Sequence, residues 1–216
     1  MRNLALGIGL VVLGSLTSCQ LFEGEKEAKK GDAGWVSMFD GKTMTGWKVN
    51  ESPESWSVKD GALVANGNRS HLFYVADPEP FVNFEFEATI MTRPGSNSGI
   101  YFHTAYLDSG WPKYGYECQV NNSQADPQRT AGLYETAKVF EAPAKDDAWF
   151  TMGIKVQGKR VTVTVDGRVV TDYTEPDGKQ PGTDYTRVLD KGTFALQAHD
   201  PGSTVLYKDL KVRRLP

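Results

Sequence analysis

Three short segments of the sequence carry pairs of polar or titratable side chains at alternate positions, with an apolar residue between the two members in each case. The pairs are Tyr101 with His103, Glu117 with Gln119, and Gln197 with His199. Because successive side chains of a β-strand point to opposite faces, each pair should share the face that its apolar neighbours avoid. A glutamate and two histidines on one surface could move protons, while glutamine and tyrosine could hold a polar ligand. We therefore expect a polar cleft with acid–base chemistry, built from three strands.

The elements that must position these pairs have the periodicity of strands. From Trp35 onward, apolar residues recur with a period of two, as in residues 84–90 and 161–165. Asp60-Gly61 and Asp166-Gly167 separate such runs, and Asp-Gly is typical of hairpin turns that need positive φ. The sequence therefore predicts an all-β fold, a two-sheet antiparallel β-sandwich or jelly roll whose curved sheet would gather the polar pairs into one cleft.

Composition agrees with this fold and excludes several classes of function. The chain has 216 residues, a net charge of −3, 22 Gly and 11 Pro. That content of turn-forming residues argues against a helical bundle, a coiled coil and a disordered chain. The absence of a basic excess gives no footprint for nucleic acid. The length suits one domain of ordinary size.

The N-terminal segment reads as an export and anchoring signal. Arg2 precedes an apolar run at 4–13 that is too short for a permanent membrane helix, and residues 16–19 (LTSC) resemble a bacterial lipobox. We expect a lipoprotein signal peptide at 1–18, a lipidated Cys19 and flexible tether at 19–34, and a folded domain at 35–216. The protein would then lie in the bacterial cell envelope, at the outer membrane or in the periplasm, with the lipid as its sole membrane contact. The alternative is an ordinary secretory signal in which Cys19 is incidental.

Only one other cysteine, Cys118, is present. With Cys19 lipidated no intramolecular disulfide could form, so the domain would fold by packing alone. Its place in a strand favours a small buried hydrophobe over a reactive thiol.

A series of motifs in the folded part carries a family resemblance. They are FDGKTMTGW at 39–47, WSVKDGAL at 56–63, NSGI at 97–100, GYECQV at 115–120, GLY at 132–134 and LQAH at 196–199. In content and order they resemble the 3-keto-disaccharide hydrolase domain family, across residues 35–216. The resemblance implies a fold of the concanavalin A-like lectin and glucanase type. It also implies cleavage, by hydrolysis or elimination, of glycosides that carry a ketone at C3.

The chemistry implied by the resemblance suits the polar pairs. A C3 ketone acidifies the C2 proton, so a base, a group that stabilises the enolate and an acid for the leaving oxygen would be needed. Glu117 would be the base or a ligand, and His199 an acid, base or ligand; the plain alternatives are a solvated carboxylate and a surface histidine. His103 is a third catalytic candidate, at a place where many relatives carry Arg. A divalent cation held by Glu117, His103 or His199 would also suit a ketone and its neighbouring hydroxyl, although no ligand spacing requires one.

Five further residues are expected to bind the sugar. Tyr101 and Tyr134 could stack on or hydrogen-bond to a ring, Gln119 and Gln197 could position it, and Trp111 could form a rim from the loop at 104–115. Aromatic groups alone would suffice for a second kind of function, a non-catalytic carbohydrate-binding lipoprotein on the same sandwich.

Three other titratable residues have weaker claims on the site. His71 is expected at the surface, while Glu85 and Glu87 could line the same cleft but by default occupy an exposed strand face.

Overall fold

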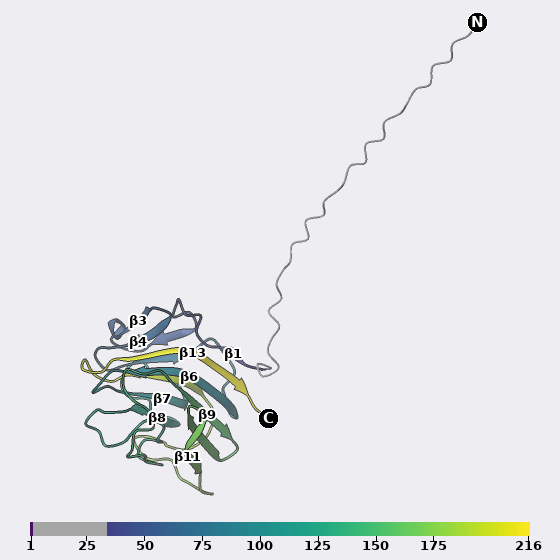
Figure 1. Ribbon diagram of the computed structural model, residues 1–216. Helices are drawn as coiled ribbons and strands as arrows, with labels where there is room; N and C mark the ends of the chain where they lie inside the picture. Colours follow the sequence, from purple (N-terminus) through teal and green to yellow (C-terminus); the bar gives the residue numbers. More distant parts are fainter. Residues whose placement is uncertain (2–33) are drawn as a thin grey trace. The chain divides into compact units, whose positions relative to one another are not determined.

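Alternating apolar side chains build two antiparallel β-sheets in the computed structural model, which describes Met1 and residues 34–216 (Figure 1). Within residues 34–216, the larger sheet has eight strands in the order β11-β10-β9-β6-β13-β4-β3, and β1 pairs with β13. Its strands are β1 (Val36–Ser37), β3 (Trp56–Lys59), β4 (Ala62–Ala65), β6 (Phe84–Thr92), β9 (Phe150–Gln157), β10 (Arg160–Val165), β11 (Arg168–Thr174) and β13 (Val205–Arg214). The all-β sandwich predicted from the sequence is confirmed.

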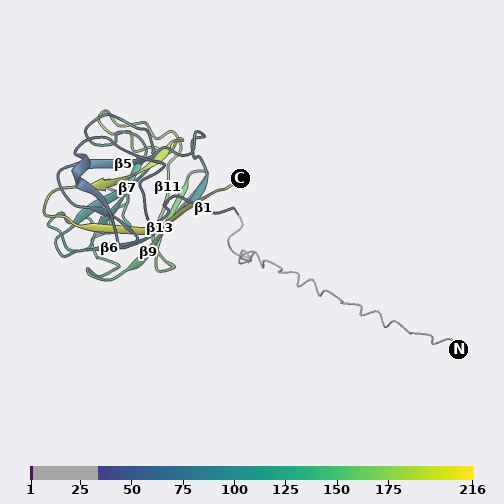
Figure 2. The same ribbon diagram turned by 90° about the horizontal axis from the view of Figure 1, so that it is seen from above.

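The smaller sheet carries the polar pairs, except that His199 directly follows its strand β12. Its five strands follow the order β2-β5-β12-β7-β8. They are β2 (Trp47–Val49), β5 (Ser70–Tyr74), β7 (Asn97–Thr104), β8 (Tyr116–Asn121) and β12 (Thr193–Ala198). Figure 2 shows the two layers, with β5 and β7 in one and β6, β9 and β13 in the other. Residues far apart in the sequence are thereby neighbours, as Tyr101 pairs with Glu117 on one side and Ala195 on the other.

Both predicted Asp-Gly hairpins form. Asp60 and Gly61 have φ values of 50° and 79° between β3 and β4, and Asp166 and Gly167 have 48° and 77° between β10 and β11. Positive φ at both central residues is the backbone that a two-residue turn needs to follow the twist of its strands.

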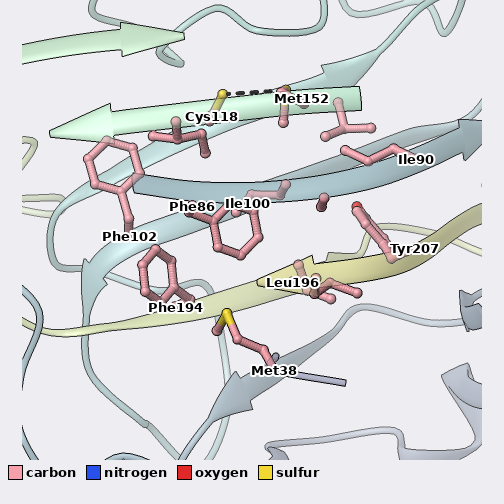
Figure 3. Close-up of a cluster of buried hydrophobic side chains, with 14 of the residues drawn as sticks. Met38, Phe86, Ile90, Ile100, Phe102, Cys118, Met152, Phe194, Leu196 and Tyr207 are labelled. Carbon is pink, nitrogen blue, oxygen red and sulfur yellow. Dashed lines mark hydrogen bonds between the residues drawn. The ribbon is translucent and has the colours of Figure 1, made fainter. Parts of the chain in front are cut away.

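The core lies between the sheets and is rich in aromatic rings (Figure 3). Phe194 of the smaller sheet stacks on Phe86 of the larger, with ring centroids 5.0 Å apart. Cys118 is free and buried, with its Sγ 3.8 Å from Sδ of Met152. Burial raises the pKa of this thiol well above its ordinary value, so it packs as a small hydrophobe.

Three expectations fall on a part of the chain that the structure leaves undescribed. The signal peptide, the lipidated Cys19 and the tether lie outside the described residues, apart from their end residues Met1 and Gly34. In the part that is described, the 3-10 turn η1 (Pro53–Ser55) is the one helical element, and no helix has the length and apolar character to cross a bilayer.

Candidate active site

A cavity of about 320 Å³ opens on the face of the smaller sheet that points away from the core. Seven of the eight residues predicted for the site line it: Tyr101, Trp111, Glu117, Gln119, Tyr134, Gln197 and His199. Strands β7, β8 and β12 supply the base of the cavity, and the alternation explains why, since Tyr116, Cys118 and Val120 face the core while Glu117 and Gln119 face the cavity.

Glu117 is a half-buried carboxyl on β8, the edge strand of the smaller sheet. Its Oε1 accepts a hydrogen bond of 3.2 Å from Nε2 of Gln197, whose amide also donates to the Tyr101 hydroxyl at 2.9 Å. Burial raises the pKa of Glu117 to about 7, although hydrogen bonds from Tyr101 and Gln197 favour the ionised form. A carboxyl tuned in this way can both accept and return a proton near neutral pH.

Gly99 makes the room for this carboxyl. It lies on β7 opposite Gln119, next to the Glu117 position. A Cβ atom on Gly99 would come within 2.8 Å of Cγ and 2.9 Å of Cδ of Glu117. Because real side chains do not tolerate such contacts, any larger residue would displace the glutamate from its present position.

His199 forms an ion-pair-like contact with the residue that follows it. Its Nδ1 lies 2.7 Å from Oδ2 of Asp200, which also accepts the Ser203 hydroxyl at 2.8 Å. Burial raises the pKa of Asp200, but hydrogen bonds from His199 and Ser203 outweigh it and hold the pKa below its usual value. The ionised aspartate fixes the orientation of the ring and leaves Nε2 available to a ligand.

His103 does not reach the cavity, which corrects the face assigned to it from the alternation. Its φ of 55° breaks the strand geometry at the end of β7, and its ring packs against Phe84, 5.6 Å between centroids. The buried ring meets the Val82 carbonyl with Nε2 at 2.8 Å and the Asp190 amide with Nδ1 at 3.2 Å. Both nitrogens are thus used in holding loops together, and burial lowers the pKa of this histidine.

Trp111 forms a wall of the cavity and contacts two histidines. Its ring lies 5.5 Å from that of His199 and 5.4 Å from that of His71. Glu51 anchors the loop, because its Oε1 accepts both the Gly110 amide at 3.0 Å and Nε of Arg69 at 2.9 Å.

His71 is wholly buried behind Trp111, so its expected place at the surface is wrong. The loop that carries Trp111 covers it, and neither ring nitrogen has a hydrogen-bond partner among the described residues. Burial lowers the pKa of His71 to about 3.

Several lining residues were missed by the sequence analysis. They are Asn97, Lys113, Tyr114, Asp126, Tyr185 and Arg187, of which Asn97 alone lies on a strand. Asp126 accepts the Tyr134 hydroxyl at 3.1 Å, and the Arg187 charge favours ionised Glu117. Asn97 stands in the NSGI motif, whereas the loop residues carry no periodic signal that could have revealed them.

Glu85 and Glu87 lie elsewhere. They project from β6 of the larger sheet, where Glu85 pairs with Nζ of Lys155 at 3.2 Å and Glu87 with Nζ of Lys211 at 2.9 Å. Their outward position follows the default expectation.

The suggested cation ligands are not brought together. Glu117 and His199 share the cavity, but His103 lines a different pocket. Within residues 34–216, no three His, Cys, Asp or Glu side chains cluster closely enough to hold a metal ion. The protein groups that face the cavity offer acid–base and hydrogen-bonding chemistry. The acid–base groups are Glu117 on β8 and His199, which directly follows β12.

Comparison with known proteins adds a family and a fold. A family model described as the 3-keto-alpha-glucoside-1,2-lyase-like domain matches residues 34–213. A curated relative, the 3-keto-disaccharide hydrolase of Bacteroides thetaiotaomicron, is 32% identical over 78 residues, which are 32% of this chain and 27% of that protein. The match thus spans about a quarter of the length of that relative.

Solved structures show the same sandwich. A suspected glycosyl hydrolase of Parabacteroides distasonis has a TM-score of 0.71 at 21% identity, over 85% of this chain and 94% of that one. A carbohydrate-binding module of Bacillus subtilis gives a TM-score of 0.54 at 15% identity, over 80% and 98%. A lichenase from a mouse hindgut metagenome gives 0.55 at 11%, over 83% and 98%. At these identities the likeness concerns the fold, which matches the predicted lectin and glucanase type.

Proposed function

This chain belongs to the 3-keto-alpha-glucoside-1,2-lyase-like domain family, and from that membership we propose that it cleaves the glycosidic bond of glycosides that carry a ketone at C3. The observation that carries the proposal is the Glu117 carboxyl, which lies in the cavity with its pKa raised to about 7. A carboxylate of ordinary pKa is a weaker base, so the burial that raises this pKa suits the removal of a carbon-bound proton.

We assign the two proton transfers of the reaction to Glu117 and His199, which both line the cavity. Glu117 removes the proton from C2, and the electron pair passes to the C3 carbonyl to give an enolate. When the enolate collapses, a double bond forms between C1 and C2, the bond from C1 to the glycosidic oxygen breaks, and the C3 ketone returns. His199 donates a proton to the departing oxygen, and its contact with Asp200 orients the ring for this step. Addition of water to C1 would complete net hydrolysis.

The neighbouring side chains serve binding and orientation. Gln197 and Tyr101 hold Glu117 through the hydrogen-bond network that joins all three groups. Gln119, whose amide donates to Asn97 Oδ1 at 3.1 Å, and Tyr134 supply polar contacts for hydroxyl groups. Trp111 presents an aromatic wall to one side of the sugar.

A non-catalytic carbohydrate-binding role is the second candidate. It is favoured by the fold shared with a carbohydrate-binding module and by the aromatic wall at Trp111. Binding alone would not need a half-buried carboxyl with a raised pKa, because its desolvation costs stability without adding affinity for a neutral sugar.

The test compares a chromogenic 3-keto-β-glucoside with its unoxidised parent. We expect turnover of the keto compound alone, with kcat/KM rising through about pH 7 as Glu117 loses its proton. Glu117→Gln should lower kcat by about 10²–10⁴-fold, the usual contribution of general-base catalysis. Glu87→Gln, on the other sheet, is the matched control and should retain activity. Saturable binding of the keto compound without turnover would instead favour the carbohydrate-binding role.

We also propose that the domain acts in the cell envelope, held by lipid on Cys19. The apolar run and the LTSC box at residues 16–19 support this. Membrane fractions of expressing cells should retain the wild type and lose Cys19→Ala; equal retention of both proteins would count against lipidation.

A further inference from the structure

A second pocket of about 400 Å³ adjoins the cavity and shares two of its walls. Tyr185 and Arg187 line both spaces, and the second pocket continues to Tyr173, Lys179 and Gln180. The loop between β11 and β12 forms this boundary, and it is anchored where the Thr186 amide donates to the Lys113 carbonyl at 2.8 Å. The two spaces are therefore adjacent, and a group attached to a sugar in the cavity would have to pass Tyr185 and Arg187 to enter the second pocket.

Lys179 gives the second pocket a fixed positive charge. Its Nζ is 2.7 Å from the Tyr116 hydroxyl and 3.2 Å from the Tyr173 hydroxyl. An ammonium group has three N–H donors, so two are used by neutral phenols and the third has no partner among the described residues. The two phenols hold the half-buried lysine in place without neutralising its charge.

The acidic groups around Lys179 are already engaged. Glu175 accepts the Tyr116 hydroxyl at 2.5 Å and the Leu189 amide at 2.8 Å. Glu135 lines the second pocket, but it pairs with Nζ of Lys138 at 2.8 Å. Neither Lys179 nor Arg187 forms an ion pair within residues 34–216. Both line the pocket, whereas the one acidic residue in its lining, Glu135, pairs with Lys138, so the lining itself carries more positive than negative charge.

We propose that the second pocket is the subsite for the leaving group of the glycoside and that, through Lys179 and Arg187, it favours leaving groups that bear a carboxylate. The inference rests on the proposed function, since it assigns the part of the substrate beyond the glycosidic oxygen. A carboxylate there would receive charge-assisted hydrogen bonds from Lys179 and from the Arg187 guanidinium, while Tyr173 and Tyr185 would pack against its ring or chain.

Two matched substrates test the subsite. The 4-carboxyphenyl and 4-carbamoylphenyl 3-keto-β-glucosides have nearly the same shape and differ in charge. The readout is the ratio of their kcat/KM values in each variant relative to the wild type, which cancels the different reactivities of the two phenols. Lys179→Gln should lower this ratio about tenfold, the effect of losing one charge-assisted hydrogen bond. Lys179→Arg should preserve it, and Lys155→Gln on the larger sheet is the control for a general loss of positive charge.

The possible outcomes separate the subsite from the catalytic proposal. An unchanged ratio in Lys179→Gln, with normal turnover of both substrates, would overturn the subsite and leave the catalytic proposal intact. If the wild type cleaves neither compound, the catalytic proposal fails. The subsite is then tested by calorimetry with the unoxidised 4-carboxyphenyl and 4-carbamoylphenyl glucosides. If Lys179→Gln binds the acid more weakly than the wild type does but binds the amide equally well, the subsite is supported. If the two proteins bind the acid equally well, the subsite is overturned. Urea unfolding curves for both Lys179 variants identify any loss of fold.

Discussion

Two histidines of the smaller sheet are almost equally buried but differ in what their ring nitrogens meet. His71 has no hydrogen-bond partner for either nitrogen among the described residues, whereas His103 uses both, with Val82 and Asp190. An unpaired buried nitrogen carries its full desolvation cost. We therefore expect His71→Phe, whose ring would pack on Tyr101 and Trp111, to raise the free energy of unfolding by about 1 kcal/mol.

His103→Phe is the matched control. It leaves the Val82 carbonyl and the Asp190 amide without partners, so the free energy of unfolding should fall by about 1–3 kcal/mol. Urea denaturation at pH 7 measures both changes. If His71→Phe were destabilised as strongly as His103→Phe, the buried imidazole would be making polar interactions that these contacts do not include.

At the scale of strands, the Glu117 side chain of β8 fills the space that a side chain at Gly99 of β7 would occupy, so its position depends on a missing side chain. Gly99 has no positive φ, so Gly99→Ala should fold with a free energy of unfolding within about 1 kcal/mol of the wild type. Its methyl group would push the Glu117 carboxyl out of line with C2, and we expect kcat/KM for the keto substrate to fall at least about tenfold.

Gly153→Ala on β9 is the matched control, because it adds a crowded methyl group without displacing the Glu117 carboxyl. Its Cβ would lie 2.7 Å from Oγ1 of Thr164, a similar contact on the outer face of the larger sheet. It should therefore affect stability without lowering activity. Full activity in Gly99→Ala would mean that the orientation of Glu117 is unimportant for catalysis.

The same strands show how far the sequence could predict the site. Residues in regular strands, such as Glu117 and Gln197, were placed on the correct face because alternation is a local property of the backbone. His103 was misplaced because its positive φ ends that alternation, and nothing in the neighbouring residues signals it. His71 was assigned to the surface because its cover, the loop that carries Trp111, comes from a distant part of the chain.

Loop residues mark the second limit of prediction from sequence. Arg187 reaches the cavity because its loop is fixed by a hydrogen bond from the Thr186 amide to Lys113, a contact between segments more than seventy positions apart in the chain. Such positions are set by tertiary contacts, which hydrophobic periodicity does not encode.

For the whole molecule, Glu117 and His71 have opposite effects on how stability depends on pH. Folding raises the Glu117 pKa from 4.5 to about 7, so between these values the folded state binds more protons and stability falls as the pH rises. Folding lowers the His71 pKa from 6.5 to about 3, so over that range the unfolded state binds more protons and stability falls as the pH drops. Where the two ranges overlap, their contributions should largely cancel.

Glu117→Gln removes one side of this balance. Relative to the wild type, its free energy of unfolding should be unchanged near pH 4.5, should increase steadily up to about pH 7, and should stay higher by a constant amount above that. Glu85→Gln provides the opposite sign, because pairing with Arg213 and Lys155 lowers the Glu85 pKa despite burial, so its loss should destabilise at neutral pH and matter less in acid. Urea titrations from pH 4.5 to 8 give both curves. A stability gain for Glu117→Gln that is equal at every pH would show that its effect does not come from the buried charge, and would remove the support that this carboxyl gives to catalysis near neutrality.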